Sequence, residues 1–422
     1  MISIKELRKN KKSVTKRLAL KQNDIYLDEV LTLDQKLRDL KTTSNDMRSE
    51  RNTASESIGQ LKKAGKDATV FINKTRELGD NLKKIERELE LVQIKLNEIL
   101  YQIPNPPHES CPEGRNELEN IEIRRWGNEP TYDFKLKNHL DIGNDLNLFD
   151  FKRGAKLSGS GFPLYIGNGA KLERALINSM IKHHEKEFGF KEIFPPVLML
   201  KQSMQTTGQL PKFEEDMYHT EVDNLYLAPT AEVPITNMHR NEIIEESNLP
   251  INYVGYSPCF RRESGSYGKD TRGLLRVHQF NKVELVKFTS QETSYNELES
   301  LTLQAESVLQ KLGLHYRTIE LCTGDLSFSA AKCYDIEIWA PAEKKWLEVS
   351  SCSNFESFQA RRGNIRYRKT DTNKIDLVHT LNGSGVATPR LMVALIETYQ
   401  TKKGNIVFPE NVAEFLGIKE IN

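Results

Sequence analysis

The most restrictive feature of this sequence is a proline-free stretch, 32–101, in which apolar residues follow heptad spacing. Apolar positions recur at alternating steps of four and three in two runs, 33–61 and 71–103. Such spacing lines one face of an α-helix and drives pairing with another helix. The segment between the runs, 64–68, reads Ala-Gly-Lys-Asp-Ala and predicts a tight turn. We therefore expect two long helices folded back as an antiparallel hairpin.

The same heptads are also compatible with an oligomerisation coiled coil. A hairpin, however, pairs its own apolar faces and can serve as a projecting arm. Helices of this length would extend on the order of 50 Å. Ser44 and Arg51 interrupt the first run, so its middle should pack more loosely. Lys62, Lys63 and Lys66 near the turn could meet the phosphates of a polyanion.

The charge of the chain is divided unevenly along its length. The net charge is only +1. Residues 1–100 carry 22 basic and 16 acidic side chains, a net charge of +6, whereas the remainder carries 38 and 43, a net charge of −5. A basic N-terminal part on an acidic body indicates a polyanionic partner for the first part.

Cysteine usage and hydropathy indicate a protein of a reducing cytoplasm. The five cysteines are an odd number, are widely scattered and form no Cys-x-x-Cys, so we expect reduced, buried thiols and no structural zinc. No apolar run reaches the roughly 18 residues of a membrane span, and the N-terminus lacks a signal-peptide pattern. We therefore expect no membrane association.

A proline-rich linker separates two parts of different texture. Four prolines within 104–112 cannot continue a helix, so we place the domain boundary here, with an arm and linker over 1–110 and a second domain over 111–422. The second domain alternates short strand patterns with helical stretches over 169–188, 289–312 and 389–400. Because the strands cluster without a helix between each pair, we expect an α+β fold, an antiparallel sheet with flanking helices.

Three segments of this domain suit nucleotide chemistry. The first is a strand, a loop and a second strand, with Arg261 at the end of the first strand and Phe280 on the second. An arginine can bind a phosphate with two hydrogen bonds, and an aromatic ring can stack on a base. The second pairs the oxygens of Glu348 and Ser351, of the kind that Mg²⁺ prefers. The third places Arg390 at a predicted helix start, where anions are favoured. Walker, dinucleotide-binding, zincin and kinase signatures are absent.

Long strings in these segments resemble class II aminoacyl-tRNA synthetases and, within that class, bacterial-type seryl-tRNA synthetases. The strings include Leu-Ala-Pro-Thr-Ala-Glu at 227–232, Phe-Arg-Arg-Glu-Ser-Gly-Ser at 260–266, Ser-Ser-Cys-Ser-Asn-Phe-Glu at 350–356 and Leu-Asn-Gly-Ser-Gly at 381–385. The resemblance covers essentially the whole chain, arm included. Departures occur at 387–390, where Ala-Thr-Pro-Arg replaces a common glycine-containing form, and at Ser327 and Ser329, where relatives often have glycine.

The resemblance implies a set of residues for each substrate. Serine would be bound by Thr230, Ala231, Glu232, Arg261, Glu284 and Ser384. ATP would be bound by Arg261, Arg262, Glu263, Phe280, Glu348, Val349, Ser350, Ser351 and Arg390, with Arg261 and Arg390 as the catalytic residues. Mg²⁺ would be held by Glu348 and Ser351. The conformation of the loop 264–273 does not follow from the sequence.

The resemblance also implies partners and a reaction. Serine would be activated with ATP to seryl-adenylate and transferred to tRNA(Ser), and to tRNA(Sec) where that tRNA is present. The helix and strand over 169–196 would form a homodimer interface. Two other interpretations remain at this point: a ligase of the same fold that loads a carrier protein, and a coiled-coil RNA-binding protein with an inactive catalytic domain.

Overall fold

The computed structural model describes residues 1–21, 27–264 and 272–422. Most of the loop 264–273, whose conformation the sequence left open, thus lies outside the described residues. The chain divides into two compact units. One consists of Ile2–Ala19 and Asn23–Pro104, and the other of Asn105–Asn422 with Met1 and Leu20–Gln22.

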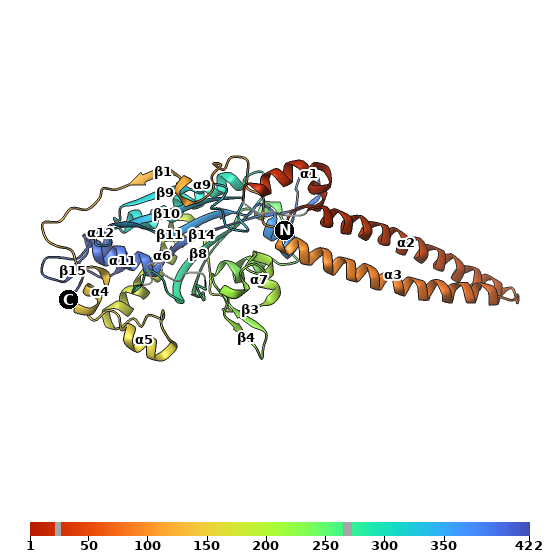
Figure 1. Cartoon of the computed structure of the whole chain (residues 1–422), viewed down its shortest axis with the longest axis horizontal. Coiled ribbons are helices and arrows are strands. Elements are labelled where there is room, and N and C mark those ends of the chain that lie inside the picture. Colours follow the sequence, from red (N-terminus) through yellow and green to blue (C-terminus); the bar gives the residue numbers. More distant parts are fainter. Residues whose placement is uncertain (22–26, 265–271) are drawn as a thin grey trace. The chain divides into compact units, whose positions relative to one another are not determined.

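The N-terminal unit is the expected helical hairpin. Two long helices, α2 (Leu27–Lys63) and α3 (Thr69–Gln102), run side by side, preceded by a shorter α1 (Ile4–Ala19) that the heptad analysis did not predict (Figure 1). In the turn, Gly65 takes a φ of +67°, which glycine adopts without steric cost. The Asp67 carboxylate accepts the backbone N–H of Thr69 at 2.9 Å, an Asx-type bond that starts α3.

Ion pairs across the hairpin define its antiparallel register. Lys36 pairs with Glu88 at 2.7 Å near the base and Lys74 with Glu50 at 2.6 Å nearer the turn. The apolar seam is tightest near the base, where Leu96 and Leu100 are fully buried. The expected hairpin is confirmed, and its two helices bury their apolar faces against each other.

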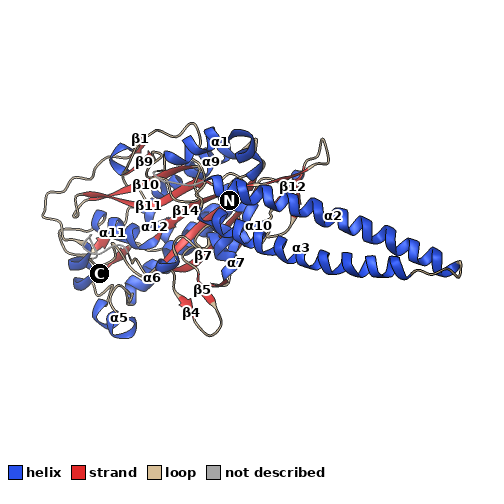
Figure 2. Cartoon of the chain, turned by 45° about the vertical axis from the view of Figure 1, so that its right-hand side comes forward, coloured by secondary structure: helices blue, strands red, loops and turns tan. Residues whose placement is uncertain are grey.

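The second unit is built on one eight-stranded sheet (Figure 2). Every neighbouring pair is antiparallel except β2 and β7, which are parallel. The predicted α+β fold with an antiparallel sheet is confirmed. In spatial order the strands are β1 (Ile121–Trp126), β9 (Tyr316–Glu320), β10 (Lys332–Ala340), β11 (Lys345–Asn354), β14 (His379–Ala387), β8 (Gln279–Thr289), β7 (Ile251–Phe260) and β2 (Lys191–Ile193).

Smaller sheets and helices surround this sheet. The minor sheets comprise β3 (Leu198–Leu200), β5 (Leu225–Leu227) and β4 (His219–Thr220); β13 (Ile375–Leu377), β12 (Arg366–Arg368) and β6 (Ile243–Glu245); and β15 (Ile406–Val407) with β16 (Glu420–Ile421). The helices are α4 (His139–Asp145), α5 (Phe151–Ser158), α6 (Gly167–Phe188), α7 (Lys201–Thr207), α8 (Glu232–Asn237), α9 (Ser294–Lys311), α10 (Phe358–Gly363), α11 (Thr388–Thr398) and α12 (Glu410–Leu416).

Three of these helices, α6, α9 and α11, contact the central sheet and share its main apolar core. Close approach at the start of α6 requires a glycine, because a Cβ at Gly169 would lie 2.1 Å from the carbonyl oxygen of Leu148. Helix α9 begins later than predicted. Thr289 is fully buried and pairs with His379 in the sheet, so β8 continues to that residue before the helix can start.

All five cysteines are free and buried, as their spacing predicts. Burial raises the pKa of the Cys352 thiol to about 12 and that of Cys111 to about 11, so both are protonated and unreactive at neutral pH. In the described part of the chain, no helix has both the length and the apolarity to cross a bilayer.

Candidate active site

A cavity of about 730 Å³ lies where β8, β11, β14 and the first turn of α11 converge. Most of the residues predicted from the sequence line it. They are Thr230, Glu232, Arg261, Glu263, Phe280, Glu348, Val349, Ser350, Ser351, Ser384 and Arg390. Three predicted residues do not line it: Ala231 and Glu284 are fully buried, and the Arg262 side chain is exposed. The fold thus gathers segments up to 160 positions apart in the chain into one pocket.

Two carboxylates form one end of the site, and both are withdrawn from water. Glu232 and Glu284 are 6% and 0% exposed. The amide of Asn382 bridges them, donating to Glu232 Oε2 at 2.9 Å and to Glu284 Oε1 at 3.1 Å. Burial and the neighbouring charge of Glu284 raise the pKa of Glu232 to about 7. This end of the cavity therefore attracts a cationic group.

The neighbours of the two carboxylates are set by strand register. Ser384 on β14 lies directly opposite Glu284 on β8, so the hydroxyl and the carboxylate share one face of the sheet. Thr230 accepts the backbone N–H of Glu232 at 3.1 Å and thereby fixes the turn into α8. The arrangement joins hydroxyl and carboxylate groups in one small, nearly dry space, which suits a small amino acid with a hydroxyl group.

An arginine and an aromatic ring form the next part of the cavity. Arg261 follows the last residue of β7, and its guanidinium carbon lies 5.2 Å from the centre of the Phe280 ring. Its Nε donates to the carbonyl of Pro229 at 3.3 Å. Glu263 accepts from Arg276 at 2.9 Å and lines the same wall. A cation beside an open ring face can bind a phosphate while the ring stacks on a base.

Arg390 lies in the first turn of α11, as predicted. Its Nε donates to the carbonyl of Leu275 at 3.1 Å and its Nη1 to the carbonyl of Glu348 at 2.9 Å. These bonds hold the guanidinium at the cavity wall. The N-terminus of α11 adds its own positive potential there. This end of the cavity is built to receive an anion.

Oxygen donors for a divalent cation lie on β11. Glu348 and Ser351 both line the cavity, and the side chain of Glu348 is 50% exposed. Ser351 pairs across the sheet with Asp335, and burial together with the charge of Glu348 raises the pKa of Asp335 well above its ordinary range. The carboxylate oxygens of Glu348 and the hydroxyl of Ser351 are donors of the kind that Mg²⁺ prefers, so these two residues fit the ion.

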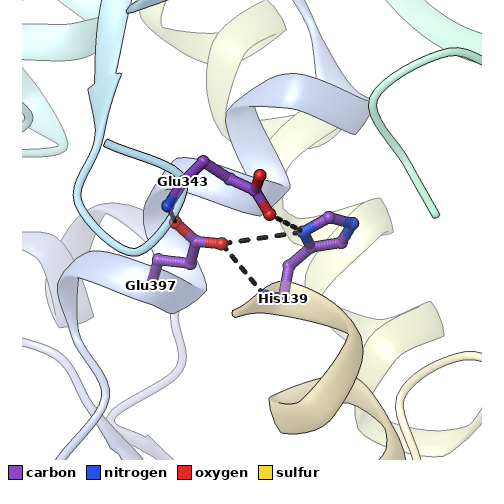
Figure 3. A group of neighbouring side chains, drawn as sticks. All are labelled: His139, Glu343 and Glu397. Carbon is purple, nitrogen blue, oxygen red and sulfur yellow. Dashed lines mark hydrogen bonds and ion pairs between the residues drawn. The ribbon is translucent and has the colours of Figure 1, made fainter. Parts of the chain in front are cut away.

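A second acidic cluster supports the cavity without lining it (Figure 3). Nδ1 of the buried His139 lies 3.3 Å from Glu343 and 3.6 Å from Glu397, while Nε2 accepts the backbone N–H of Leu274 at 3.4 Å. Nδ1 is thus the ring nitrogen that faces the two carboxylates, whereas Nε2 faces the backbone of Leu274. The cluster anchors Leu274, which lines the cavity, to α11.

Sequence reasoning missed several residues at the carboxylate end. Lys282 lines the cavity and lies 2.5 Å from Glu284, and Gln359 donates to Glu232 at 2.6 Å. Asn382 bridges the two carboxylates. A signal for Lys282 was present, because alternation along β8 places residues 280, 282 and 284 on one face. No local signal could have identified Gln359 or His139, whose partners lie more than 100 positions away.

The sheet order and the arginine-lined cavity are those of a class II aminoacyl-tRNA synthetase core. The family described as tRNA synthetase class II core domain (G, H, P, S and T) matches residues 212–399, and the Seryl-tRNA synthetase N-terminal domain matches 1–107. The chain belongs to the seryl-tRNA synthetase family. It is 50% identical to the serine–tRNA ligase of Carboxydothermus hydrogenoformans, over 100% of this chain and 99% of that protein. It is 51% identical to that of Caldicellulosiruptor saccharolyticus over 99% of both chains.

Solved structures agree with this assignment. The crystal structure of seryl-tRNA synthetase from Pyrococcus horikoshii complexed with ATP matches with a TM-score of 0.89 at 36% identity, covering 100% of this chain and 99% of that one. The cytoplasmic serine–tRNA ligase of Naegleria fowleri in complex with AMP matches with a TM-score of 0.82 at 28% identity, covering 97% and 95%.

Proposed function

We propose that this protein is a serine–tRNA ligase that activates L-serine with ATP and transfers it to tRNA(Ser). The observation that carries the proposal is a cavity lined by Glu232, Ser384 and Arg261, with the buried Glu284 linked to Glu232 through Asn382, in a chain related over its full length to serine–tRNA ligases. The buried carboxylates supply charge and hydrogen bonds for an ammonium and a hydroxyl group, and the arginines receive anions.

The serine end comprises Thr230, Ala231, Glu232, Glu284 and Ser384, with Arg261 for the substrate carboxylate. A pocket with polar groups at 0 to 7% exposure rejects alanine, because the bound alanine would leave those groups unpaired. Threonine would be rejected by size. The domain division that accompanies this assignment is 1–110 for the arm and linker and 111–422 for catalysis.

The ATP end comprises Arg262, Glu263, Phe280, Val349 and Ser350, together with Arg261 and Arg390. Phe280 stacks on adenine, Arg261 binds the α-phosphate and Arg390 the γ-phosphate. Glu348 and Ser351 would hold Mg²⁺, which neutralises phosphate charge when bound. The oxygen donors on β11 support this assignment, and we propose no zinc site.

The first reaction needs no nucleophile from the protein. The serine carboxylate is already ionised and attacks the α-phosphorus of ATP, while the bond to the β-phosphate oxygen breaks and pyrophosphate leaves. The protein positions the two substrates and neutralises charge with Arg261 and Arg390. A ribose hydroxyl of the terminal adenosine of the tRNA then attacks the activated acyl carbon, and AMP leaves.

The partners follow from the arm and the sheet edge. The helical arm, whose turn region carries Lys62, Lys63 and Lys66, would contact tRNA(Ser) through phosphates and A-form shape, and tRNA(Sec) where it exists. The helix α6 with β2 would form a homodimer interface. We propose a cytoplasmic location, in keeping with five free thiols.

The test is serine-dependent ATP–pyrophosphate exchange followed by charging of tRNA. We expect exchange with serine, little with alanine or threonine, and near-total loss of exchange in Arg261→Ala. We also expect transfer of serine to tRNA(Ser). Adenylate formation without transfer to tRNA would refute the synthetase assignment and favour a ligase for a carrier protein. Absence of exchange would favour an inactive RNA-binding protein.

A further inference from the structure

The feature that the proposed reaction leaves unused is Lys282. Its side chain is 7% exposed, lines the cavity and lies 2.5 Å from Glu284 Oε2. Glu284 itself is 0% exposed and does not line the cavity. The ammonium of Lys282 therefore lies between the cavity and the carboxylate expected to receive serine.

Every oxygen of the two carboxylates already faces a protein cation or hydrogen-bond donor. Glu232 accepts from Gln359 at Oε1 and from Asn382 at Oε2. Glu284 accepts from Asn382 at Oε1 and pairs with Lys282 at Oε2. An ammonium group that arrives with serine would compete with these three protein groups for the carboxylate oxygens.

Of the three, Lys282 is the group that can move. Gln359 is 0% exposed and also donates to the carbonyl of Thr207 at 3.2 Å, so it is held from two sides. Asn382 has a short side chain that is tied to both carboxylates. Lysine carries its charge on a flexible four-carbon stem, and this one already borders the cavity.

The position of Lys282 on β8 shows where its ammonium can go. Residues 280, 282 and 284 share one face, and Lys282 lies about 7 Å along the strand from each of the other two. Phe280 marks the adenine end of the proposed site and Glu284 the amino-acid end. The serine carboxylate and the α-phosphate must meet between them, next to Lys282.

We propose that Lys282 exchanges partners when serine binds and becomes a substrate-contacting cation of the adenylation step. The substrate ammonium takes its place on Glu284, and the lysine ammonium moves onto the serine carboxylate and an α-phosphate oxygen. Glu284 thus keeps a cationic partner throughout the exchange, and no buried carboxylate is left unpaired. Lys282 stays protonated throughout: the bond formed is carboxylate oxygen to α-phosphorus, and pyrophosphate leaves. This inference rests on the proposed serine-activating function.

The test compares two buried lysines of the same strand in the full-length protein. Lys287 also lies on β8, is 1% exposed and is paired with Glu297 at 2.9 Å, but it does not line the cavity. Lys282→Met and Lys287→Met each remove one buried cation from a pair, so both should destabilise the fold. The rate of single-turnover adenylate formation at saturating serine and ATP distinguishes the loss of a substrate contact from a loss of stability alone.

We expect Lys282→Met to lower the rate of adenylate formation about 100-fold or more, the usual effect of removing one charge-stabilising group from a reaction centre. Lys287→Met should stay within about threefold of the wild-type rate. Lys282→Arg should retain more activity than Lys282→Met. Added n-propylammonium should partly restore the rate of Lys282→Ala, which a merely structural lysine would not allow.

Two results would overturn the proposal. One is a saturating rate in Lys282→Met within threefold of wild type. The other is an equal loss in Lys287→Met together with no rescue of Lys282→Ala by the amine. Absence of serine-dependent exchange in the wild-type protein would instead refute the proposed function and remove the basis of this inference. Thermal melting of each variant shows which proteins are folded under the assay conditions.

Discussion

The buried carboxyl group of Glu232 makes the stability of the catalytic unit depend on pH in a way that one substitution can isolate. Burial and the charge of Glu284 raise its pKa from an ordinary value of 4.5 to about 7. The folded protein therefore holds this proton more tightly than the unfolded chain does. The stabilisation from this group is complete below pH 4.5 and is lost as the pH rises through 7.

The size of the effect follows from the two pKa values. For a single group shifted from 4.5 to about 7, linkage gives a loss of about 2.5 kcal/mol in the free energy of unfolding between pH 5 and pH 8. In Glu232→Gln this dependence disappears. The side-chain NH₂ of the new residue must face a donor from Gln359 or Asn382, which lowers stability by about 1 kcal/mol at every pH.

Urea unfolding followed by tryptophan fluorescence is the appropriate assay. All three tryptophans, Trp126, Trp339 and Trp346, lie on strands of the central sheet, so the signal reports the catalytic unit and not the arm. The free energy of unfolding is measured at pH 5, 6, 7 and 8 for the wild type and Glu232→Gln. Glu185→Gln, at an exposed position of α6, is the matched control.

We subtract the free energy of unfolding of Glu232→Gln from that of the wild type at each pH. This difference should fall by about 2.5 kcal/mol from pH 5 to pH 8. The control should run parallel to the wild type over the same range. If the free energy of unfolding of Glu232→Gln also changes with pH as the wild-type value does, to within about 0.5 kcal/mol, then Glu232 is ionised without penalty in the fold. The electrostatic account of the pocket would then be wrong.

Three further outcomes can be checked. Gly169→Ala should lower the free energy of unfolding by about 1 to 3 kcal/mol, because the added Cβ would meet the carbonyl of Leu148. At Gly79 on α3 an added Cβ meets nothing within 4 Å, so Gly79→Ala should slightly raise the helicity of the arm measured by circular dichroism. Arg390→Ala should raise the KM for ATP at least tenfold in exchange assays with little change in that for serine. Lys62→Gln with Lys63→Gln should weaken tRNA charging and reduce its salt dependence, with unchanged exchange.

Local patterns predicted the parts of this fold that depend on local physics. The heptads specify both helices of the hairpin, and the Gly65 turn lies at the expected place, in the five residues 64–68 that separate the two helices. The strand patterns around 283–286 and 334–339 lie within β8 and β10. In each case the signal is the periodicity of one segment.

Contacts between distant segments were outside the reach of pattern reasoning. The family resemblance implies a role for Glu284 but assigned none to its partner Lys282, and the ion pair between them is seen only in the folded chain. The His139 cluster joins α4, α11 and the turn after β10, and only the folded chain brings these together. The end of β8 at Thr289 was set by pairing with His379, which no local propensity records.

The five buried thiols make the catalytic unit its own reporter of partial unfolding. Each cysteine is buried in the folded protein, so an alkylating reagent modifies it only when its surroundings open. Cys111 lies in the linker and packs with Cys333 of β10, whereas Cys352 lies in the middle of the sheet. The order in which mass spectrometry finds these sulfurs modified in dilute urea would map which part of the domain loosens first, without any added label.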